Sequence, residues 1–459
     1  MKITLRAIMA IALCKFLRAL SRLLHRGGTA MPGYWAIKLC PTLLSTLSVE
    51  VRTVAVTGTN GKTTCSRMIE EAFRNAGYDY FANRSGANLM SGITTEFVMN
   101  CTLGGRMKKH YAVIECDEAA ARTVFAQLQP EVIVVTNLFR DQLDRYGEIT
   151  HTLNNIRHGI HGVRSATLCL NADCSLTASL AEDESGHRIW WYGIDQSAEL
   201  RAVQTLLSDA SHCIHCKTEY EYDYHTYAHL GGFRCPHCGY RRPDTDFAVT
   251  RILCMDDSHS EVMMQTPHGE VQVTVNLPAS YNLYNAAAAL SASEAIGISH
   301  ETCIRSLAGF SCGFGRMEVL PLAGGARMIL VKNPAGCTQA LGYLSSIDKD
   351  YILVACLNDR AADGTDISWI WDADFELLNS MSSHIHQIYI SGDRAQDLAL
   401  RMKYAGLPED RMVLLQEPEK LLDALEKEAL PLYIMPTYTA MLELRSAIVH
   451  RCGGAEFWE

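Results

Sequence analysis

The sequence predicts an α/β protein with a doubly wound parallel sheet, followed by a second, Rossmann-like α/β domain. Three observations lead to this prediction. A buried-type strand runs into a glycine-rich loop and a helix at residues 53–77. Strand-like and helix-like segments then alternate as far as residue 180, and a second alternating series begins after residue 326. Such alternation is typical of parallel sheets whose strands are connected by helices.

The first element has the sequence TVAVTGTNGKTT and is the most informative stretch of the chain. Its apolar start predicts a buried strand, and the MIEEAFRNAG segment after the loop has helical periodicity. A strand, a glycine loop and a helix N-terminus together form a phosphate cradle, because backbone N–H groups and the helix dipole point at the anion. We expect ATP to be bound by Thr57, Gly58, Thr59, Asn60, Gly61, Lys62, Thr63 and Thr64.

Within this loop, two side chains have expected roles in the chemistry. Lys62 is expected to reach the β- and γ-phosphates, and the Thr63 hydroxyl is expected to contact Mg²⁺. The strict phosphate-loop pattern has a glycine five residues before Gly61, where Val56 stands in this chain. The strand–loop–helix context supports the assignment despite this departure.

The next two elements are β-branched runs at 111–117 and 131–138, and each is followed by polar residues. The first run ends in Glu115, Asp117 and Glu118. Because ligands of open α/β sheets bind beyond the carboxyl ends of the strands, these acids are expected to hold Mg²⁺ directly or through water. Past the second run, Asn137, Asp141 and Asp144 occupy the corresponding position, within 137–144.

A change in composition at about 208–243 marks an insertion rich in Cys, His and Tyr. Cys213 and Cys216 are separated by two residues, as are Cys235 and Cys238, and eighteen residues lie between the pairs. This spacing is typical of a tetrahedral Cys₄ zinc site. Four thiolates close the coordination shell, so the expected zinc ribbon has a structural role. The alternatives are a redox dithiol pair or four unrelated thiols.

After the insertion, residues 252–278 predict antiparallel strands and residues 280–297 an alanine-rich helix. Residues 321–326 have the Pro and Gly content of a linker. Beyond them, strands interleave with helices as far as residue 440. We therefore expect a first unit at 1–320, with an N-terminal helix and an ATP-binding domain, and an α/β domain at 321–459.

Overall composition excludes some classes of function. The formal net charge of −10 argues against general nucleic-acid binding, which needs a basic face. Hydrophobic residues make up 48% and charged residues 20% of the chain, as in globular proteins with a sizeable core. The 17 cysteines show no secreted-scaffold pattern, which indicates reduced thiols and a cytoplasmic location.

The N-terminal segment, residues 1–28, contains six Lys and Arg residues and no acidic residue. Its longest uncharged run, 7–14, is too short to span a bilayer. The large apolar residues fall on one helical face and most basic residues on another. Two interpretations stay open: peripheral contact with an anionic membrane at its inner face, or packing of the helix against its own domain.

Four motifs in the order TGTNGKTT, YAVIECDE, TNLFRDQLDRYG and SYNLYNAAAAL resemble those of the Mur ligase family. Those enzymes use ATP to activate a carboxylate as an acyl phosphate and then form an amide. The resemblance implies a Mur-ligase central domain, with Asn282 and Asn285 on the adenine side and Arg316 near the domain junction. It also suggests that Lys332 contacts phosphate, and Glu115 and Lys62 are expected to be catalytic.

The cysteine insertion and the segments LVKNPAGCTQAL and CLNDRAADGTDISWIWDADFE narrow the resemblance to one branch of the family. That branch comprises the synthetase subunits of lipid II isoglutaminyl synthases. The resemblance implies a glutaminase partner, GatD, which would supply ammonia from glutamine. The substrate would be lipid II or a related peptidoglycan precursor, whose D-glutamate α-carboxylate would be amidated to D-isoglutamine.

In this branch the synthetase subunit is thought to contribute an Asp to the partner's Cys–His pair, where it would orient the histidine. Asp366 is the first candidate for this role and Asp363 the second. Trp369 and Trp371, close by in sequence, suit either a partner-contacting surface or the domain core.

Two rival functions are weighed against this one. The first is a stand-alone ligase that joins an amino acid to a carboxylate, as Mur ligases and folylpolyglutamate synthase do. The absence of lysine in 150–180, where several such ligases have a carbamylated one, argues against it. The second is a non-catalytic ATP-binding module that uses its zinc ribbon for nucleic acid, and the acidic net charge argues against that.

Overall fold

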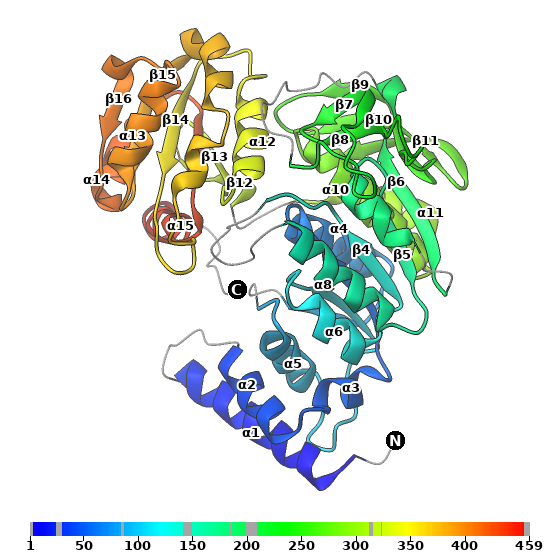
Figure 1. Ribbon diagram of the computed structural model, residues 1–459. Coiled ribbons are helices and arrows are strands. Elements are labelled where there is room, and N and C mark those ends of the chain that lie inside the picture. The colour runs from blue at the N-terminus through cyan, green and yellow to red at the C-terminus, as the bar shows by residue number, and fades with distance from the viewer. Residues whose placement is uncertain are drawn as a thin grey trace.

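The computed structural model describes residues 3–23, 30–83, 87–140, 149–182, 186–198, 209–311, 315–322 and 324–453. Figure 1 shows three parts, namely a group of N-terminal helices at the foot, a central α/β body above them, and a C-terminal α/β domain beside the upper half of that body.

The central body is built on a nine-stranded sheet with the order β11-β10-β9-β6-β5-β4-β1-β3-β2. Strands β2, β3, β1, β4, β5, β6 and β9 are neighbours in this order and all run parallel. Strands β10 and β11 extend the sheet beyond β9 as antiparallel strands, as expected for 252–278. Their bounds are β1 (Arg52–Thr57), β2 (Tyr80–Ala82), β3 (Tyr111–Glu115), β4 (Val132–Val135), β5 (Thr167–Asn171), β6 (Arg188–Ile194), β9 (Phe247–Met255), β10 (Ser260–Thr266) and β11 (Gly269–Val275).

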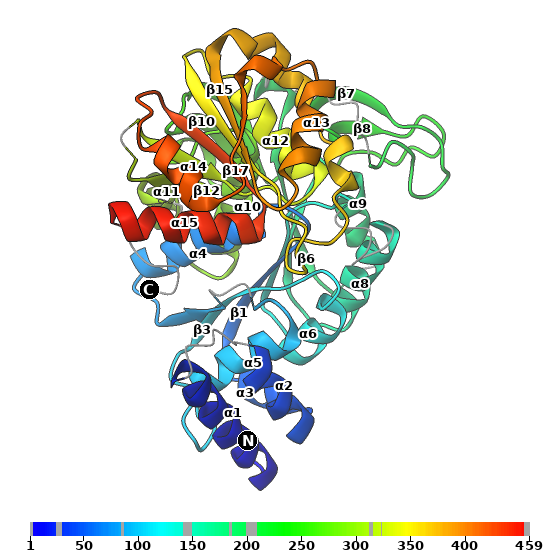
Figure 2. The ribbon, with the colours of Figure 1, turned by 90° about the vertical axis from the view of Figure 1, so that its left-hand side faces the viewer.

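Helices cover both faces of this sheet, and Figure 2 shows α4 and α10 on one side and α6 and α8 on the other. The central strands β1 and β4 consist almost entirely of buried residues, because a sheet covered on both faces has no solvated side. The helices of the body are α4 (Lys62–Asn75), α5 (Met90–Met99), α6 (Ala121–Leu128), α8 (Ile149–His161), α9 (Ser175–Ala178), α10 (Tyr281–Ala295) and α11 (His300–Gly309), with 3-10 turns at Ser179–Ala181 and Gln196–Ala198.

The N-terminal helices α1 (Leu5–Leu23), α2 (Ala30–Leu39) and α3 (Leu43–Ser48) pack beneath the body against α5 and α6. Gly33 of α2 lies so close to α5 that a Cβ there would stand 1.8 Å from the Ser91 carbonyl oxygen. A glycine is therefore required for this close approach. Among the described helices, none is both long enough and apolar enough to cross a membrane.

The cysteine-rich insertion contains the hairpin β7 (Glu221–Tyr227) and β8 (Leu230–Arg234), which forms a separate two-stranded sheet. Asp173, directly after β5, joins this insertion to the main sheet. Arg242 Nε donates to Asp173 Oδ1 at 2.6 Å, and the Tyr284 hydroxyl donates to Oδ2 at 2.6 Å. The Ile194 N–H donates to Oδ2, and the Gly231 N–H donates to the Asp173 carbonyl.

Burial raises the pKa of the Asp173 carboxyl, and Arg242 and the other donors oppose that rise. The side chain of Asp173 is fully buried, whereas Arg242 is 15% exposed. A charge this deeply buried persists only when its hydrogen-bonding partners are all in place. The ion pair therefore fixes the insertion to the end of β5.

The C-terminal domain has a six-stranded sheet with the order β12-β13-β17-β14-β15-β16, in which only the β12–β13 pair is antiparallel. Its strands are β12 (Arg316–Leu320), β13 (Ala326–Ile329), β14 (Tyr351–Cys356), β15 (Ile385–Ser391), β16 (Met412–Leu414) and β17 (Leu432–Pro436). Its helices are α12 (Pro334–Leu344), α13 (Ala395–Tyr404), α14 (Pro418–Leu425) and α15 (Tyr438–Cys452), with 3-10 segments at Ser368–Trp371, Phe375–His384 and Glu409–Arg411.

The expected boundary at 320/321 lies too far along the chain. Residues 316–320 form β12, which pairs with β13 inside the second sheet. Buried Glu318 accepts from Arg445 Nε of α15 at 3.0 Å, so this strand belongs to the C-terminal core. The described residues 321–322 and 324–325 of the expected linker therefore lie between the two paired strands of a hairpin. Proline and glycine are common both in linkers and in hairpin turns, so composition alone did not distinguish the two.

Replacement of Asp173 by alanine is expected to destabilise the protein by about 3–5 kcal/mol, because it removes the fully buried carboxylate that accepts from Arg242, Tyr284 and the Ile194 N–H. Arg242 would keep its ion pair with the partly exposed Asp195. The measurement is urea unfolding of the full chain. Glu131→Ala is the control, since Glu131 pairs with Arg52 on the surface, where both side chains are more than 40% exposed. That loss is expected to be about 0–1 kcal/mol. Equal losses in the two variants would contradict the proposed role of Asp173.

Candidate functional site

The loop between β1 and α4 has the backbone that a phosphate cradle needs. Gly58 and Gly61 have φ values of 119° and 85°, in the region that favours glycine. A Cβ on Gly58 would lie 2.3 Å from Thr136 Oγ1, and one on Gly61 would lie 2.1 Å from Asn285 Oδ1. Gly61 is also the N-cap residue of α4, so the first amides of that helix open toward the loop.

The ammonium group of Lys62 lies inside this loop, and the residue is only 8% exposed. Its Nζ donates to Glu118 Oε1 at 3.0 Å and to the carbonyl oxygens of Gly58 and Thr59. Glu118 is itself buried. The loop thus holds one positive charge, balanced by one carboxylate, at the N-terminus of α4.

Thr63 and Glu115, two of the residues expected to hold Mg²⁺, meet beside this charge. The Thr63 hydroxyl donates to Glu115 Oε2 at 2.9 Å, and Arg316 Nη2 lies 3.4 Å from the same hydroxyl oxygen. Asn83 fixes the end of β3, because its side chain hydrogen-bonds both the Glu115 N–H and the Glu115 carbonyl. Asn83 has no distinctive sequence motif, and sequence reasoning missed it.

Asp117 has a different environment from Glu115 and Glu118. Its Oδ1 accepts from the Ala119 N–H at 3.0 Å, which is the hydrogen bond of a turn at the start of α6. A magnesium role for Asp117 stays a prediction. Asp141 and Asp144 lie outside the described residues.

Asn60 is the point where the two domains meet at the phosphate loop. Asn137, beyond β4, accepts from the Asn60 N–H at 3.0 Å and donates to its carbonyl at 3.1 Å. From the C-terminal domain, Asn333 Nδ2 donates to Asn60 Oδ1 at 3.2 Å. Asn333 is also the N-cap of α12. A role was expected for Lys332 but not for Asn333, although Asn-Pro is a helix-start signal in the sequence.

A cleft opens between the domains at this point, and it collects most of the residues predicted to bind nucleotide. Asn282 and Asn285 reach it from α10, Arg316 from β12, and Lys332 from the turn before α12. The Asn285 amide donates to Asn282 Oδ1 at 3.2 Å, which orients the pair. The lining residues are Asn60, Gly61, Thr64, Tyr281, Asn282, Asn285, Gly315, Arg316, Met317, Ile329, Leu330, Lys332, Gly336 and Gln339.

The residues present fit ATP and Mg²⁺. The side-chain Nδ2 of Asn60 is a buried donor with no hydrogen-bond partner in the part of the chain that the structure describes. A buried donor without an acceptor is costly, and a phosphate oxygen at the loop would satisfy it. The Thr63 hydroxyl and the Glu115 carboxylate are oxygen ligands of the kind that Mg²⁺ prefers.

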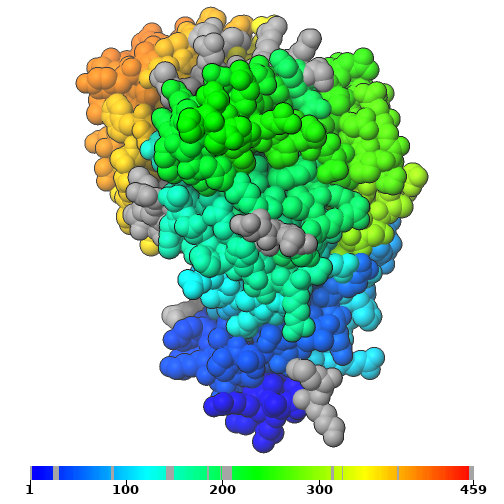
Figure 3. Space-filling model, turned by 45° about the vertical axis from the view of Figure 1, so that its right-hand side comes forward, coloured from blue at the N-terminus to red at the C-terminus, as the bar shows by residue number. Residues whose placement is uncertain are grey.

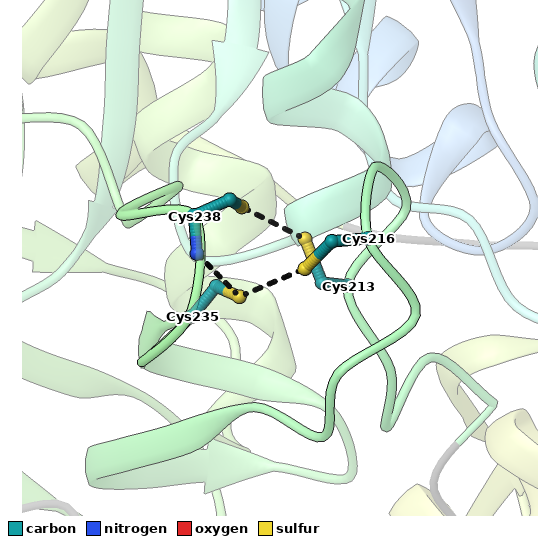
Figure 4. Close-up of side chains that lie close together, drawn as sticks. All are labelled: Cys213, Cys216, Cys235 and Cys238. Carbon is teal, nitrogen blue, oxygen red and sulfur yellow. Dashed lines mark hydrogen bonds between the residues drawn. The ribbon is translucent and has the colours of Figure 1, made fainter.

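The four cysteines of the insertion converge, as Figure 4 shows. All four sulfur atoms lie within 4.8 Å of one another, with 3.5 Å between Cys213 and Cys238 and 3.4 Å between Cys216 and Cys235. A disulfide needs about 2.05 Å, so these are free thiols. Tetrahedral zinc with sulfur ligands at about 2.3 Å requires S–S separations of just under 4 Å. The cluster therefore fits a closed zinc site.

The two cysteine turns share one backbone geometry. The residue after each pair has positive φ, 62° at Lys217 and 78° at Gly239. In each turn, the N–H of that residue donates to the carbonyl of the pair's first cysteine. Two turns of the same form that present thiols to each other are what a zinc ribbon requires. His212, His215 and His237 are exposed and are not part of the cluster.

Asp366 and Asp363 lie in very different environments within the loop after β14. Asp366 is exposed, and its Oδ1 accepts from the Ser368 N–H at 2.8 Å. This hydrogen bonding lowers the pKa of Asp366, so its carboxylate is ionised at neutral pH. Asp363 is buried, and both of its oxygens bind Thr439 in the first turn of α15. The geometry favours Asp366 as a group available to a partner.

A second cluster of possible metal ligands lies outside the cleft. His268 Nε2 is 3.3 Å from one oxygen of Glu294, and His300 Nδ1 is 2.6 Å from the other. This cluster ties the β10–β11 turn to α10 and α11. None of the three residues lines the nucleotide cleft.

Comparison with known proteins gives two family matches. A model of the Mur ligase middle domain matches residues 56–232, and a model described as MurT ligase C-terminal matches residues 330–441. The chain is 33% identical over 426 residues to the lipid II isoglutaminyl synthase (glutamine-hydrolyzing) subunit MurT of Streptococcus pneumoniae, covering 92% of this chain and 93% of that protein. The subunit of the same name from Staphylococcus aureus is 33% identical over 398 residues, covering 86% and 87%.

Solved structures show the same fold at low sequence identity. MurF from Acinetobacter baumannii matches with a TM-score of 0.66 and 16% identity, covering 90% of this chain and 80% of that one. Folylpolyglutamate synthase from Mycobacterium tuberculosis matches with a TM-score of 0.59 and 13% identity, covering 88% and 93%. The predicted fold class, a Mur-ligase central domain followed by an α/β domain, is confirmed.

Gly61→Ala is expected to lower the affinity for an ATP analogue by about tenfold or more, because the added Cβ collides with Asn285 and displaces the loop. Gly77→Ala, at the other end of α4, is a matched control. Gly77 also has positive φ, at 72°, but nothing lies within 4 Å of an added Cβ. Titration calorimetry measures both variants. Equal affinities would show that the collision does not matter for binding.

Proposed function

The chain belongs to the MurT family of Mur ligases, and from this membership we propose that it is the synthetase subunit of a lipid II isoglutaminyl synthase. The reaction is the ATP-dependent amidation of the α-carboxylate of D-glutamate in the peptidoglycan stem peptide, which gives D-isoglutamine. The observation that carries the proposal is the 33% identity to subunits of that name over about nine-tenths of the chain. The cleft supplies the matching chemistry.

ATP is the first substrate, and its expected position follows from the cleft. The phosphates would lie on the loop of 57–64, with the adenine toward Asn282 and Asn285. Lys62 would exchange its bond to Glu118 for the β- and γ-phosphates and neutralise their charge. Arg316 and Lys332 come from the other domain and would add positive charge on the opposite side of the nucleotide.

A carboxylate is a poor electrophile until one of its oxygens becomes a leaving group. Attack of the substrate carboxylate on the γ-phosphorus would give an acyl phosphate and ADP, and ammonia would then displace phosphate to form the amide. A bound Mg²⁺ would supply positive charge that offsets the charge of the phosphates. Thr63 and Glu115 are proposed to hold the ion, with Asp117 and Glu118 around it.

Ammonia requires a source, and we propose a GatD-like glutaminase as the partner subunit. The exposed carboxylate of Asp366 is proposed to complete the partner's Cys–His pair by orienting its histidine. Trp371, which is 49% exposed, and Tyr404, which is 71% exposed, have ring centroids 5.8 Å apart and form an aromatic surface suited to such a partner. Trp369 is half-buried and packs against the core.

The proposed role of zinc is structural. The thiolates of Cys213, Cys216, Cys235 and Cys238 would fill the coordination shell and leave no open position for a substrate. The small core beneath them contains only a few aromatic residues, among them Tyr220 and Phe233. A core of this size gains much of its stability from a bound metal.

The proposal is tested by comparing two nitrogen sources in the complex with the glutaminase. Lys62→Ala is expected to abolish amidation driven by either glutamine or free ammonium, because phosphoryl transfer itself is lost. Product is measured by mass spectrometry of the precursor. Lys349→Ala is the control, since Lys349 is an exposed lysine paired with Asp257. Near wild-type amidation by Lys62→Ala would refute the phosphate-loop assignment.

Asp366→Asn is expected to behave differently in the same assay. Glutamine hydrolysis is expected to be lost, since the partner's histidine loses its orienting charge, while ammonium-driven amidation continues. Asp363→Asn is the matched comparison. It is expected to lower the stability of the protein, because Asp363 is buried against Thr439, and to leave the ratio of glutamine-driven to ammonium-driven amidation nearly unchanged. Loss of the ammonium-driven reaction with retained glutaminase activity would place Asp366 in the synthetase site instead.

The metal prediction is measured separately, on protein purified under reducing conditions. We expect one zinc ion per chain by elemental analysis, and Cys235→Ser is expected to release it and lower solubility. Cys254→Ser is the control, because Cys254 is an exposed cysteine of β9 outside the cluster. Metal-free wild-type protein, or equal zinc loss in both variants, would contradict the site.

A further inference from the structure

Helix α1 does not pack with the face that its large apolar residues would suggest. The side chains buried against the body are mostly small: Ala7, Ala10, Ile11, Cys14 and Ser21. Lys15 Nζ donates to the Cys101 carbonyl at 2.8 Å, which holds this same side of the helix to the segment after α5. The stripe of large apolar residues predicted from the sequence therefore faces away from the protein.

That stripe is exposed along the whole helix, with side chains that range from 40% exposed at Leu20 to 77% at Leu23. Helix α2 packs against α1 and also exposes apolar residues. We call this the α1–α2 surface, and its residues are Leu5, Met9, Phe16, Leu20, Leu23, Met31, Tyr34 and Trp35. It lies at the narrow end of the molecule, far from the C-terminal domain, as Figures 1 and 3 show. Contiguous apolar residues at a surface mark an interaction site.

The charge of this end is opposite to that of the rest of the chain. Residues 1–49 contain seven Lys and Arg residues and no Asp or Glu, whereas the whole chain has a net charge of −10. The remaining residues together therefore carry −17. Arg6 and Arg22 of α1 and Lys38 of α2 are exposed, and so are Arg106 and Lys108 in the segment after α5.

We propose that the α1–α2 surface docks on an anionic lipid bilayer, with α1 lying in the plane of the interface. The apolar stripe would enter the headgroup–acyl boundary, and the exposed basic side chains would contact lipid phosphates. The negative charge of the remaining chain would be repelled by the same bilayer, so that only this end would approach it. A second copy of the chain is a poorer occupant, because two positive surfaces would face each other.

An open groove borders this surface and extends it toward the body. It lies between α2 and the start of α5, and Tyr34, Lys38 and Leu89 are among its lining residues. Leu89 is 52% exposed. An apolar groove with one ammonium group at its edge suits a lipid chain and its phosphate headgroup. This supports a lipid occupant over a flat protein partner.

The test is co-sedimentation of the full chain with vesicles, without ATP or substrate, so that the result is independent of the proposed reaction. Vesicles of phosphatidylcholine with about 30% phosphatidylglycerol are compared with phosphatidylcholine alone. We expect binding to the anionic vesicles, weaker binding to the neutral ones, and a decrease with added salt. No binding to the anionic vesicles would overturn the proposal.

Two double variants locate the contact. Phe16→Ser/Leu20→Ser is expected to weaken vesicle binding by about tenfold or more, since two inserted side chains are removed. Leu253→Ser/Met255→Ser removes two exposed apolar residues from β9, at 43% and 37% exposure, and is expected to have no effect. Equal loss of vesicle binding in both double variants would overturn the proposal. It would also be overturned if the wild-type chain bound no vesicles but self-associated, and Phe16→Ser/Leu20→Ser abolished that self-association. Arg6→Glu/Arg22→Glu serves as the second disruptive variant if the first fails to fold.

Discussion

The ammonium group of Lys62 is held in a buried position by Glu118 and by two carbonyl oxygens of its own loop, and the rest of the cleft is arranged around that charge. The topology of the sheet makes this possible. Strands β1 and β3 are parallel neighbours, with Val56 opposite Glu115, so the loop after β1 and the acids after β3 leave the sheet at one edge. Anionic phosphates are drawn to such a site because a buried charge interacts strongly with them.

The cleft also joins the two domains. Asn60 is held by Asn137 of the central body and by Asn333 of the C-terminal domain, while Arg316 reaches across to Thr63. A nucleotide at this place would contact both domains at once. The domain that supplies Arg316 and Lys332 also carries the exposed Asp366 in its β14 loop. In the proposed function, the C-terminal domain would therefore contact both the nucleotide and the glutaminase partner. This offers a physical route for coupling phosphoryl transfer to ammonia supply.

Much of this arrangement follows from the sequence. The phosphate loop, the strands with polar ends and the paired cysteines are local patterns, and their geometry is set by residues close together in the chain. What local patterns do not contain is the placement of one domain on another, so the Asn333–Asn60 contact was missed. The sequence also did not predict that Asp363 is buried and Asp366 exposed, because the two residues lie in similar local sequence. Periodicity located the apolar stripe of α1 but not the direction in which it faces.

The central claim is that this subunit activates a carboxylate by phosphorylation. The most direct measurement follows ¹⁸O from a labelled α-carboxylate of the stem D-glutamate during ammonium-driven amidation with ATP. One labelled oxygen is expected to appear in the inorganic phosphate released with ADP, because the acyl phosphate breaks at its carbon–oxygen bond. Label recovered in AMP, or amide formed without label in phosphate, would contradict it.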